Sequence, residues 1–408
     1  MHLQKILIVF PGPLAPIEGM SQLRAVEQIK RLSQDFLVDA AFISDHPDSL
    51  AGHKAILQDY CNEIHLIPHR KLTQGRVIGI FCSILLRINY LLTGAPISYM
   101  NLNHGSIIKK LHGICEAYYF NMVIIHYWYL GKLFNKLSPS ILKAIDTHYV
   151  VEENIENFEQ GQYDHIKNRS LGKELSFSLK KQTQFFDFSD FLIFNSHKQQ
   201  ELIRKVFPHK EMIVTPNGQV LQHFFDYPVQ IPEKFLLFYG ALDNQFNLKG
   251  IDILFERIIP SIKKSIPDLK LMFVGSNPPD WLKKMNNDDD FLVTGFVQDI
   301  RPYLVKAYLM ILPLFSAAGF RGRSVEAMAM GVPLIGSHNA LDCIGLTHGE
   351  NGYLTDDPGE MARLAIELFN NIEKRTSISV QAKLFVKEHY SIEATFGQLS
   401  NKIDTLLQ

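Results

Sequence analysis

Short apolar runs alternate with longer helical stretches along the first half of the chain. Six of these runs predict buried strands. Five lie at residues 5–10, 38–43, 63–67, 122–126 and 191–196, and another starts at residue 143 and ends at Asp146 and His148. Between the first two, residues 21–32 repeat apolar side chains at the spacing of one helical face. Strands that alternate with helices form parallel sheets covered by helices, so this half predicts one α/β domain.

The pattern restarts at Phe235. Apolar runs at 235–239, 269–275, 291–297 and 311–313 predict four more strands, and 332–335 predicts a short fifth one. Residues 325–330 and 360–369 have helical patterns, and 390–407 predicts a closing helix. The irregular segment 219–234, with two prolines, is interpreted as a linker. The expected architecture is therefore two Rossmann-like domains, 1–218 and 235–390.

Length and composition agree with this division. A chain of 408 residues exceeds one ordinary core and fits two α/β domains. The formal net charge of −1 lacks the positive surplus of a general nucleic-acid binder. Four widely spaced cysteines match no zinc or disulfide pattern, which favours a reducing cytoplasm. The N-terminal residues read as a buried strand rather than a signal peptide.

Residues 77–92 form the most apolar segment. The run is 16 residues long and contains Arg87 and Asn89, so it is too short and too polar to span a membrane. Two interpretations remain: a helix packed within the first domain, or an interfacial helix that faces a lipid acceptor.

The segment 311–337 carries the clearest chemistry. A strand is followed by a glycine-broken loop with Arg321 and Arg323, and then by a helix. Free N–H groups and the positive end of the helix dipole would meet these arginines, so the loop predicts an anion site, most simply for phosphate. Glu326, expected in the first helical turn, could accept hydrogen bonds from sugar hydroxyls. The alternative is that Glu326 only caps the helix and the arginines are solvated.

Three further strand ends carry polar groups. The loop 240–250 places Lys249 near a predicted helix start, which again favours an anion. His126 ends one strand of the first half, where open α/β sheets bind ligands. Asp146 and His148 end the next strand, either as an acid/base couple or as an aspartate that orients a histidine for structural reasons.

These motifs resemble a known family. Gly319-Phe320, Glu326-Ala-Met-Ala and Gly331-Val-Pro are similar to the nucleotide-sugar motif of retaining family 4 glycosyltransferases. That resemblance implies the GT-B fold, in which two Rossmann-like domains face a central cleft, and a helix at 391–408 that crosses back to the N-terminal domain. The second motif glutamate, which contacts the ribose, is Glu326, whereas the first is replaced by Ala318.

The resemblance also assigns roles residue by residue. His126-Tyr-Trp is similar to a family segment that lies beside the transferred sugar. Lys249-Gly250 is similar to the end of a loop in which an arginine and this lysine bind the donor diphosphate, and Ala241 stands in place of that arginine. The implied catalytic residues are His126, Lys249, Arg323 and Glu326. The implied donor-binding residues are Gly240, Lys249, Gly250, Gly295, Phe296, Val297, Gly319, Phe320, Arg321, Gly322, Arg323 and Glu326. The implied acceptor-side residues are Gly19, Asp146 and His148.

The implied function is transfer of a sugar, with retention, from a nucleotide-diphosphate sugar to an acceptor hydroxyl. A UDP- or GDP-sugar is expected as donor, and a glycan, a lipid-linked glycan or a small molecule as acceptor in polysaccharide or glycoconjugate synthesis. No cofactor or metal is expected, since no D-x-D motif with flanking context appears. The resemblance also implies that the donor phosphate itself takes the acceptor proton, so no dedicated base is expected. The expected location is the cytoplasm or the inner face of the membrane. Two alternatives remain open: a nucleotide-sugar-binding protein that has lost transfer, and a nucleotide-sugar epimerase.

Overall fold

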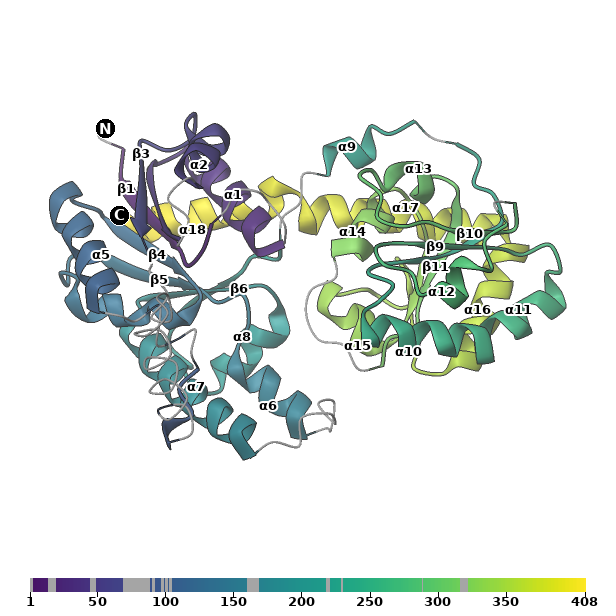
Figure 1. Cartoon of the computed structure of the whole chain (residues 1–408). Helices are drawn as coiled ribbons and strands as arrows, with labels where there is room; N and C mark the ends of the chain where they lie inside the picture. The colour runs from purple at the N-terminus through teal and green to yellow at the C-terminus, as the bar shows by residue number, and fades with distance from the viewer. Residues whose placement is uncertain are drawn as a thin grey trace. The chain divides into compact units, whose positions relative to one another are not determined.

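The chain folds into two compact units. The structure, a computed structural model, describes residues 3–13, 20–44, 49–68, 89, 92–96, 99, 102, 105–159, 169–217, 221–228, 230–287, 289–315 and 322–408. The first unit comprises Met1–Gly218 with Thr395–Gln408, and the second comprises Gln219–Ala394. Figure 1 shows an α/β arrangement in each unit.

The first unit is built on a parallel sheet of seven strands in the order β3-β2-β1-β4-β5-β6-β7. The strands are β1 (Lys5–Phe10), β2 (Leu37–Ser44), β3 (Glu63–Pro68), β4 (Met122–His126), β5 (Leu142–Asp146), β6 (Phe191–Phe194) and β7 (Glu211–Val214). The order reverses between β1 and β4, because β2 and β3 lie on one side of β1 and the later strands on the other. Ligands of open α/β sheets bind at the carboxyl ends of the strands beside such a reversal.

Helices cover both faces of this sheet, so β1 is buried on both sides and reads as a continuous apolar run. One face carries α1 (Met20–Leu32) and α2 (Ser49–Leu57), and the other carries α5 (Gly105–Tyr118), η1 (Trp128–Lys136) and α7 (Arg169–Phe188) (Figure 1). The remaining helices of this unit before Gly218 are α6 (Val151–Glu159) and α8 (His197–Arg204). Gly131 allows η1 to approach α7, since a Cβ there would lie 2.3 Å from the Phe185 ring.

The C-terminal helix α18 (Gln398–Leu407) belongs to the first unit. It follows η4 (Glu393–Gly397). Two of its side chains bond to residues of the first unit. Ser400 donates a hydrogen bond to Asp35, and Lys402 Nζ lies 2.6 Å from Glu211 Oε2. These contacts attach the end of the chain to the turn after α1 and to β7.

The second unit has a parallel sheet of six strands in the order β10-β9-β8-β11-β12-β13. The strands are β8 (Phe235–Tyr239), β9 (Lys270–Val274), β10 (Phe291–Val293), β11 (Ala307–Leu312), β12 (Leu334–Gly336) and β13 (Tyr353–Leu354). Here the order reverses between β8 and β11. The carboxyl ends of these two strands therefore mark the expected ligand position of this unit.

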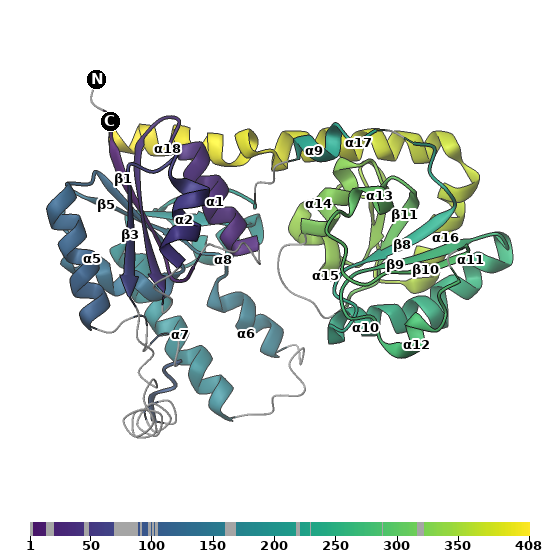
Figure 2. The same cartoon turned by 45° about the horizontal axis from the view of Figure 1, so that its top comes forward.

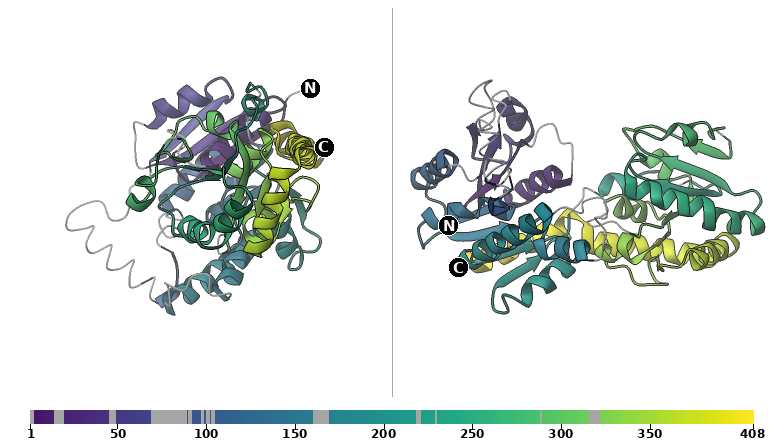
Figure 3. Two further views of the ribbon diagram at one scale, coloured as in Figure 1. Left: turned by 90° about the vertical axis from the view of Figure 1, so that its right-hand side faces the viewer. Right: turned by 60° about the horizontal axis from the view of Figure 1, so that its bottom comes forward.

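Two helical layers enclose the second sheet. One layer contains α10 (Gln245–Ile253), α11 (Ile259–Ser265) and α16 (Pro358–Asn370), and the other contains α14 (Gly322–Ala329) and α17 (Ile372–Tyr390) (Figure 2). α14 packs against α17, and Figure 3 shows the helices and the sheet of this unit from two further directions. The shorter helices are α9 (Gln222–Phe225), η2 (Leu254–Ile258), α12 (Asp280–Lys283), α13 (Arg301–Leu304), α15 (His338–Leu341) and η3 (Asp342–Ile344).

The predicted fold class, two α/β domains with parallel sheets, is confirmed. The predicted strand at 291–297 is too long, since β10 ends at Val293. Most of the apolar segment 77–92 lies outside the described residues. None of the helices formed by the described residues has the length and hydropathy of a transmembrane span.

Candidate functional site

The carboxyl ends of β8 and β11 bring several predicted donor-site residues together. Arg323 of α14 donates from Nη1 to the carbonyl oxygen of Tyr239, the last residue of β8, and from Nη2 to Asn247 Oδ1 at 3.1 Å. Gly240 makes this approach possible, because its φ is 148° and a Cβ there would lie 1.7 Å from Arg323 Nη1. A cation is thus held at the strand ends where the reversal of strand order predicts a ligand.

Glu326 lies in the same cluster with one carboxylate oxygen unused. Its side chain accepts a hydrogen bond from the Tyr239 hydroxyl. The other oxygen, Oε2, is buried and has no hydrogen-bonding partner among the described residues. Burial raises the pKa of Glu326, although the Tyr239 hydroxyl and the charge of Arg323 oppose that shift. A buried acceptor without a donor is costly, so this oxygen is suited to a ligand hydroxyl.

The helix that carries Glu326 starts earlier than predicted. α14 begins at Gly322, so Glu326 is the fifth helical residue and not a residue of the first turn. Gly322 itself is buried at the helix start. The predicted donor-site residues Gly319, Phe320 and Arg321 lie outside the described residues, as does Ala318.

Lys249 does not occupy the predicted loop. The Asn244 side chain accepts hydrogen bonds from the backbone N–H groups of Phe246 and Asn247 and so caps α10, which begins at Gln245. Lys249 is therefore an exposed residue inside the helix, one turn beyond its start. The prediction of Lys249 near a helix start was wrong because the cap shortens the loop to the residues before Gln245.

Gly250 has a packing role in this structure. A Cβ at Gly250 would lie 2.7 Å from Leu314 Cδ2 and 3.1 Å from the carbonyl oxygen of Pro313. The glycine therefore lets α10 pack closely against the chain that leaves β11. Its predicted contact with a diphosphate has no counterpart in these neighbours.

The residues predicted to hold the nucleotide base form an open loop after β10. Nothing lies within 4 Å of a Cβ at Gly295, and the Phe296 side chain is 77% exposed. Val297 packs partly against the core of the unit. The neighbouring Asp299 is already paired with Arg301, whose Nη2 lies 2.8 Å from Asp299 Oδ2. Phe296 thus offers a free aromatic face at an edge strand.

In the first unit, three predicted residues meet at the ends of β4 and β5. His126 and Asp146 are register partners on these strands, and His148 follows two residues later. His126 Nδ1 lies 2.7 Å from His148 Nε2, and His126 Nε2 lies 2.9 Å from Gln28 Oε1. Because Gln28 Oε1 only accepts, His126 Nε2 carries the proton and Nδ1 accepts from His148. Gly19, the other predicted acceptor-side residue, lies outside the described residues.

Asp146 is held by two residues that the sequence analysis missed. Arg24 Nε lies 3.1 Å from Asp146 Oδ1 and 3.0 Å from Oδ2, and Gln28 Nε2 donates to Oδ2 at 2.9 Å. Arg24 also donates to the Thr215 carbonyl oxygen and hydroxyl at 2.7 and 2.8 Å. Arg24, Asp146 and His126 are all 0% exposed. The 122-residue separation of Arg24 and Asp146 left no local signal for this pair.

The charges in this cluster follow from burial. Burial opposes ionisation of Asp146, but Arg24 and the two histidines keep its pKa below the usual value. Burial lowers the pKa of His126 to about 4 and that of His148 well below its usual value. Both histidines are therefore neutral near pH 7. Asp146 is a buried anion that bonds Arg24 and Gln28, and Gln28 in turn bonds His126, so the carboxylate touches neither histidine by a direct hydrogen bond.

One possible cation site exists among the described residues. Ligand atoms of His126, Asp146 and His148 all lie within 4.8 Å of one another. Those atoms are already hydrogen-bonded within the protein, and the Arg24 guanidinium lies on the carboxylate. A cation there would have to displace these partners and would meet the positive charge of Arg24.

A stack of aromatic rings covers this cluster. Tyr127 stacks on His148 with ring centroids 4.2 Å apart at 11°, and on Tyr129 at 5.2 Å and 12°. Tyr127 and His148 have positive φ values of 66° and 52°. All three rings are only partly buried. The stack gives the carboxyl edge of the first sheet flat faces of the kind on which sugar rings can lie.

One comparison with known protein families matches the second unit. Residues 233–371 match the family described as Glycosyl transferases group 1. The matched residues all lie in the second unit. A similar protein is 2-deoxystreptamine N-acetyl-D-glucosaminyltransferase of Niallia circulans, 30% identical over 144 residues. That match covers 34% of this chain and 36% of the relative, so the chain aligns with little more than a third of it.

The fold of the whole chain is that of GT-B glycosyltransferases. Sucrose-phosphate synthase from Thermosynechococcus elongatus matches with a TM-score of 0.67 and 17% identity, over 99% of each chain. HepE of Anabaena, in a structure with UDP, matches with a TM-score of 0.63 and 13% identity, over 98% of this chain and 100% of that one. At these identities the likeness establishes the fold alone.

Proposed function

We propose that this chain is a glycosyltransferase that moves a sugar from a nucleotide-diphosphate sugar to an acceptor hydroxyl. The observation that carries the proposal is the buried, unpartnered Oε2 of Glu326, beside Arg323 and within the part of the chain that matches group 1 glycosyl transferases. A donor hydroxyl would complete this carboxylate, and Arg323 would lie near the negative charge of the diphosphate.

The proposed reaction needs stabilisation of the leaving group. The bond between the sugar's anomeric carbon and the diphosphate oxygen breaks, the acceptor oxygen bonds to that carbon on the same face, and a donor phosphate oxygen takes the acceptor proton. Negative charge grows on the diphosphate as it leaves. Arg323 and the N-terminal end of α14 supply fixed positive potential at this edge of the sheet. No metal or other cofactor is part of this proposal.

We infer a UDP-sugar as donor, with N-acetylglucosamine as the first sugar to test. The inference is supported by the UDP in the HepE structure and by the N-acetylglucosaminyl group in the name of the Niallia circulans relative. Phe296, with its exposed ring after β10, would stack on the base. For the acceptor we propose a polyhydroxylated ring, free or lipid-linked, on its way to a glycoconjugate or polysaccharide.

The first unit suits such an acceptor through its aromatic stack. Tyr127 lies between the rings of His148 and Tyr129, so an acceptor would meet the partly exposed rings at the two ends of the stack, Tyr129 and His148. His126 is fully buried, with both ring nitrogens bonded to the protein. We therefore assign His126 the role of positioning His148 rather than of touching the transferred sugar.

The test is donor binding and hydrolysis by the full-length protein. Purified protein is incubated with UDP-N-acetylglucosamine, UDP-glucose and GDP-mannose, and the melting temperature and the slow release of nucleotide are measured. Glu326→Gln should weaken binding of the preferred donor by roughly 10- to 100-fold, the scale of one hydrogen bond to a charged group. Its unliganded melting temperature should not fall, because a buried carboxylate is removed.

Glu360→Gln is the matched control, since Glu360 is paired with Arg363 on the surface of α16. It should bind donor like the wild type. Donor binding without hydrolysis or transfer would support the alternative of a binding protein, and conversion of the donor sugar to its epimer would support an epimerase. Absence of any donor-induced stabilisation, or equal donor affinity in Glu326→Gln and wild type, would contradict the proposed site.

A further inference from the structure

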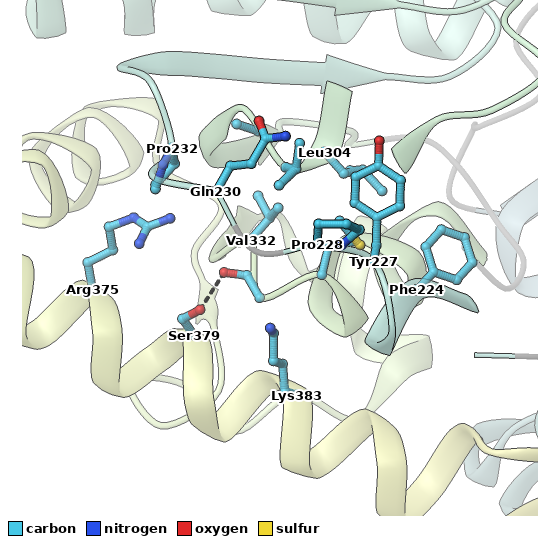
Figure 4. Close-up of a pocket in the computed structure, with 14 residues that line it drawn as sticks. Phe224, Tyr227, Pro228, Gln230, Pro232, Leu304, Val332, Arg375, Ser379 and Lys383 are labelled. Carbon is cyan, nitrogen blue, oxygen red and sulfur yellow. Dashed lines mark hydrogen bonds between the residues drawn. The ribbon is translucent and has the colours of Figure 1, made fainter. Parts of the chain in front are cut away.

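A pocket lies at the amino-terminal ends of the strands of the second sheet. The pocket has a volume of about 160 Å³ and lies between α17 and the segment that leads into β8 (Figure 4). Its walls include Pro232 before β8, Ala307 at the start of β11 and Val332 before β12. These are amino-terminal strand ends, whereas Arg323 and Glu326 belong to the carboxyl-terminal edge. The two sites are therefore separate.

One face of α17 points basic and polar groups into this pocket. Arg375, Ser379 and Lys383 follow one another at four-residue intervals and all line it. Figure 4 shows the ends of the Arg375 and Lys383 side chains directed toward the same space. Ser379 is already engaged, because its hydroxyl donates to the Gly331 carbonyl oxygen.

Arg375 is buried without an acidic partner. Its side chain is 8% exposed, its Nε donates to the Tyr308 carbonyl oxygen at 3.0 Å, and its guanidinium carbon lies 4.3 Å from the centroid of the Tyr308 ring. Among the described residues, its two terminal nitrogens have no hydrogen-bonding partner. The backbone bond and the ring contact fix the guanidinium while leaving its outer N–H groups directed toward the pocket.

Lys383 brings a second positive charge to the same pocket. The side chain of Lys383 passes over Gly331, where a Cβ would lie 2.6 Å from Lys383 Cε. The part of the chain that the structure describes offers its ammonium neither an ion pair nor a hydrogen bond. Among the described residues that line the pocket, none is an aspartate or a glutamate. Burial lowers the pKa of both Lys383 and Arg375, as expected for cations without a counter-charge.

We propose that this pocket binds a phosphate group, either free or as a small phosphate monoester, between Arg375 and Lys383. A guanidinium with two outward nitrogens binds phosphate oxygens in pairs, and an ammonium adds a point charge. The remaining lining is largely apolar and includes Phe224, Tyr227 and Pro228. The volume is close to that of an engineered cavity that holds benzene, about 150 Å³, so there is room for the phosphate and a few carbon atoms.

The proposal is tested by phosphate binding to the full-length protein. Calorimetry and melting temperatures are measured with sodium phosphate and with glycerol 3-phosphate, against sodium chloride at equal ionic strength. The measurements use an Arg323→Ala background, so that anion binding at the other edge of the sheet does not contribute. Phosphate should bind and raise the melting temperature. Tighter binding of glycerol 3-phosphate than of phosphate would identify the monoester as the ligand, and equal or weaker binding would identify free phosphate.

Two variants and one control locate the site. Lys383→Met should weaken phosphate binding at least tenfold, whereas Lys387→Met, four residues further along the same helix and exposed, should not change it. Gln230→Glu places a carboxylate in the exposed part of the lining and should also weaken binding at least tenfold without disturbing the fold. The inference is overturned if phosphate does not bind, or if binding is the same in wild type, Lys383→Met and Gln230→Glu. These outcomes do not depend on the proposed transferase activity.

Discussion

The carboxyl edges of the two sheets differ in how completely their charges are satisfied. In the first unit, Asp146 is enclosed by Arg24 and Gln28, and His126 bonds through both ring nitrogens. In the second unit, Glu326 keeps a buried oxygen without a partner. The first arrangement is complete without a ligand, and the second is not.

This difference separates two tasks of a binding surface. A buried ion pair with saturated hydrogen bonds fixes geometry, and removal of one partner is costly. An unsatisfied buried acceptor lowers the stability of the free protein but gains a donor when a ligand arrives. Changes in the first cluster are therefore expected to affect stability, and changes in the second to affect donor binding.

The largest expected effect follows removal of Arg24. Arg24→Met leaves Asp146 buried with Gln28 as its remaining close donor and should lower the free energy of unfolding by about 3–5 kcal/mol. Chemical denaturation of the full-length protein measures this change. The surface pair of Lys198 and Glu156 is the control, since Lys198→Met should cost less than about 1 kcal/mol. Similar small losses in both variants would show that the buried cluster does not stabilise the fold.

The histidines of the same cluster predict a loss of stability in mild acid. The pKa of His126 is about 4 in the folded protein and near 6.5 when unfolded, so the unfolded chain binds the proton first as pH falls through that window. Stability should therefore decrease from about pH 6.5 toward pH 4, by about 3 kcal/mol for His126 alone. Melting temperatures across this range should fall less steeply for His126→Gln than for wild type. The exposed His197 provides the control, and an equal change of slope in His197→Gln would remove His126 as the cause.

The second cluster predicts smaller effects that appear in donor binding. Arg323→Ala should weaken donor affinity by about 1.5–3 kcal/mol, the scale of charge-assisted hydrogen bonds. Lys249→Ala should cost less than about 1 kcal/mol, because Lys249 is exposed within α10 and not beside the strand ends. Titration calorimetry with the preferred UDP-sugar compares the two variants. Equal losses of donor affinity in the two variants would show that Lys249 belongs to the diphosphate site.

The features that could be predicted from the sequence are those that depend on short segments of the chain. The apolar run 5–10 became β1 with the same bounds, and a helix with Glu326 follows β11, as the pattern indicated. That helix begins at Gly322, so it also includes Arg323, which was predicted in the loop. Such features follow from local hydrophobic patterning. The predicted strand ends at His126 and Asp146 were correct for the same reason.

Features that depend on distant contacts or on one cap escaped prediction. The start of α10 depends on the Asn244 side chain, a single residue in a loop that looked longer. The partners of Asp146 come from α1, far away in sequence. α17 was not predicted, because its buried stripe includes Arg375 and Ala382 and so lacks a clear apolar signal. The proposed role of α17 in phosphate binding depends on a cavity that only the folded unit forms.

The positive φ values at Tyr127 and His148 have an entropic consequence. Tyr127 has φ 66° and ψ 137°, a conformation that costs a non-glycine residue on the order of 1–3 kcal/mol. The folded protein already contains this strain, and the stacked rings of Tyr127 and His148 hold the two loops that carry them in place. A ligand that lies on these rings would lose its own freedom but would not have to order the loops beneath it. Binding there should therefore show a smaller entropy penalty than binding to a surface formed by flexible loops.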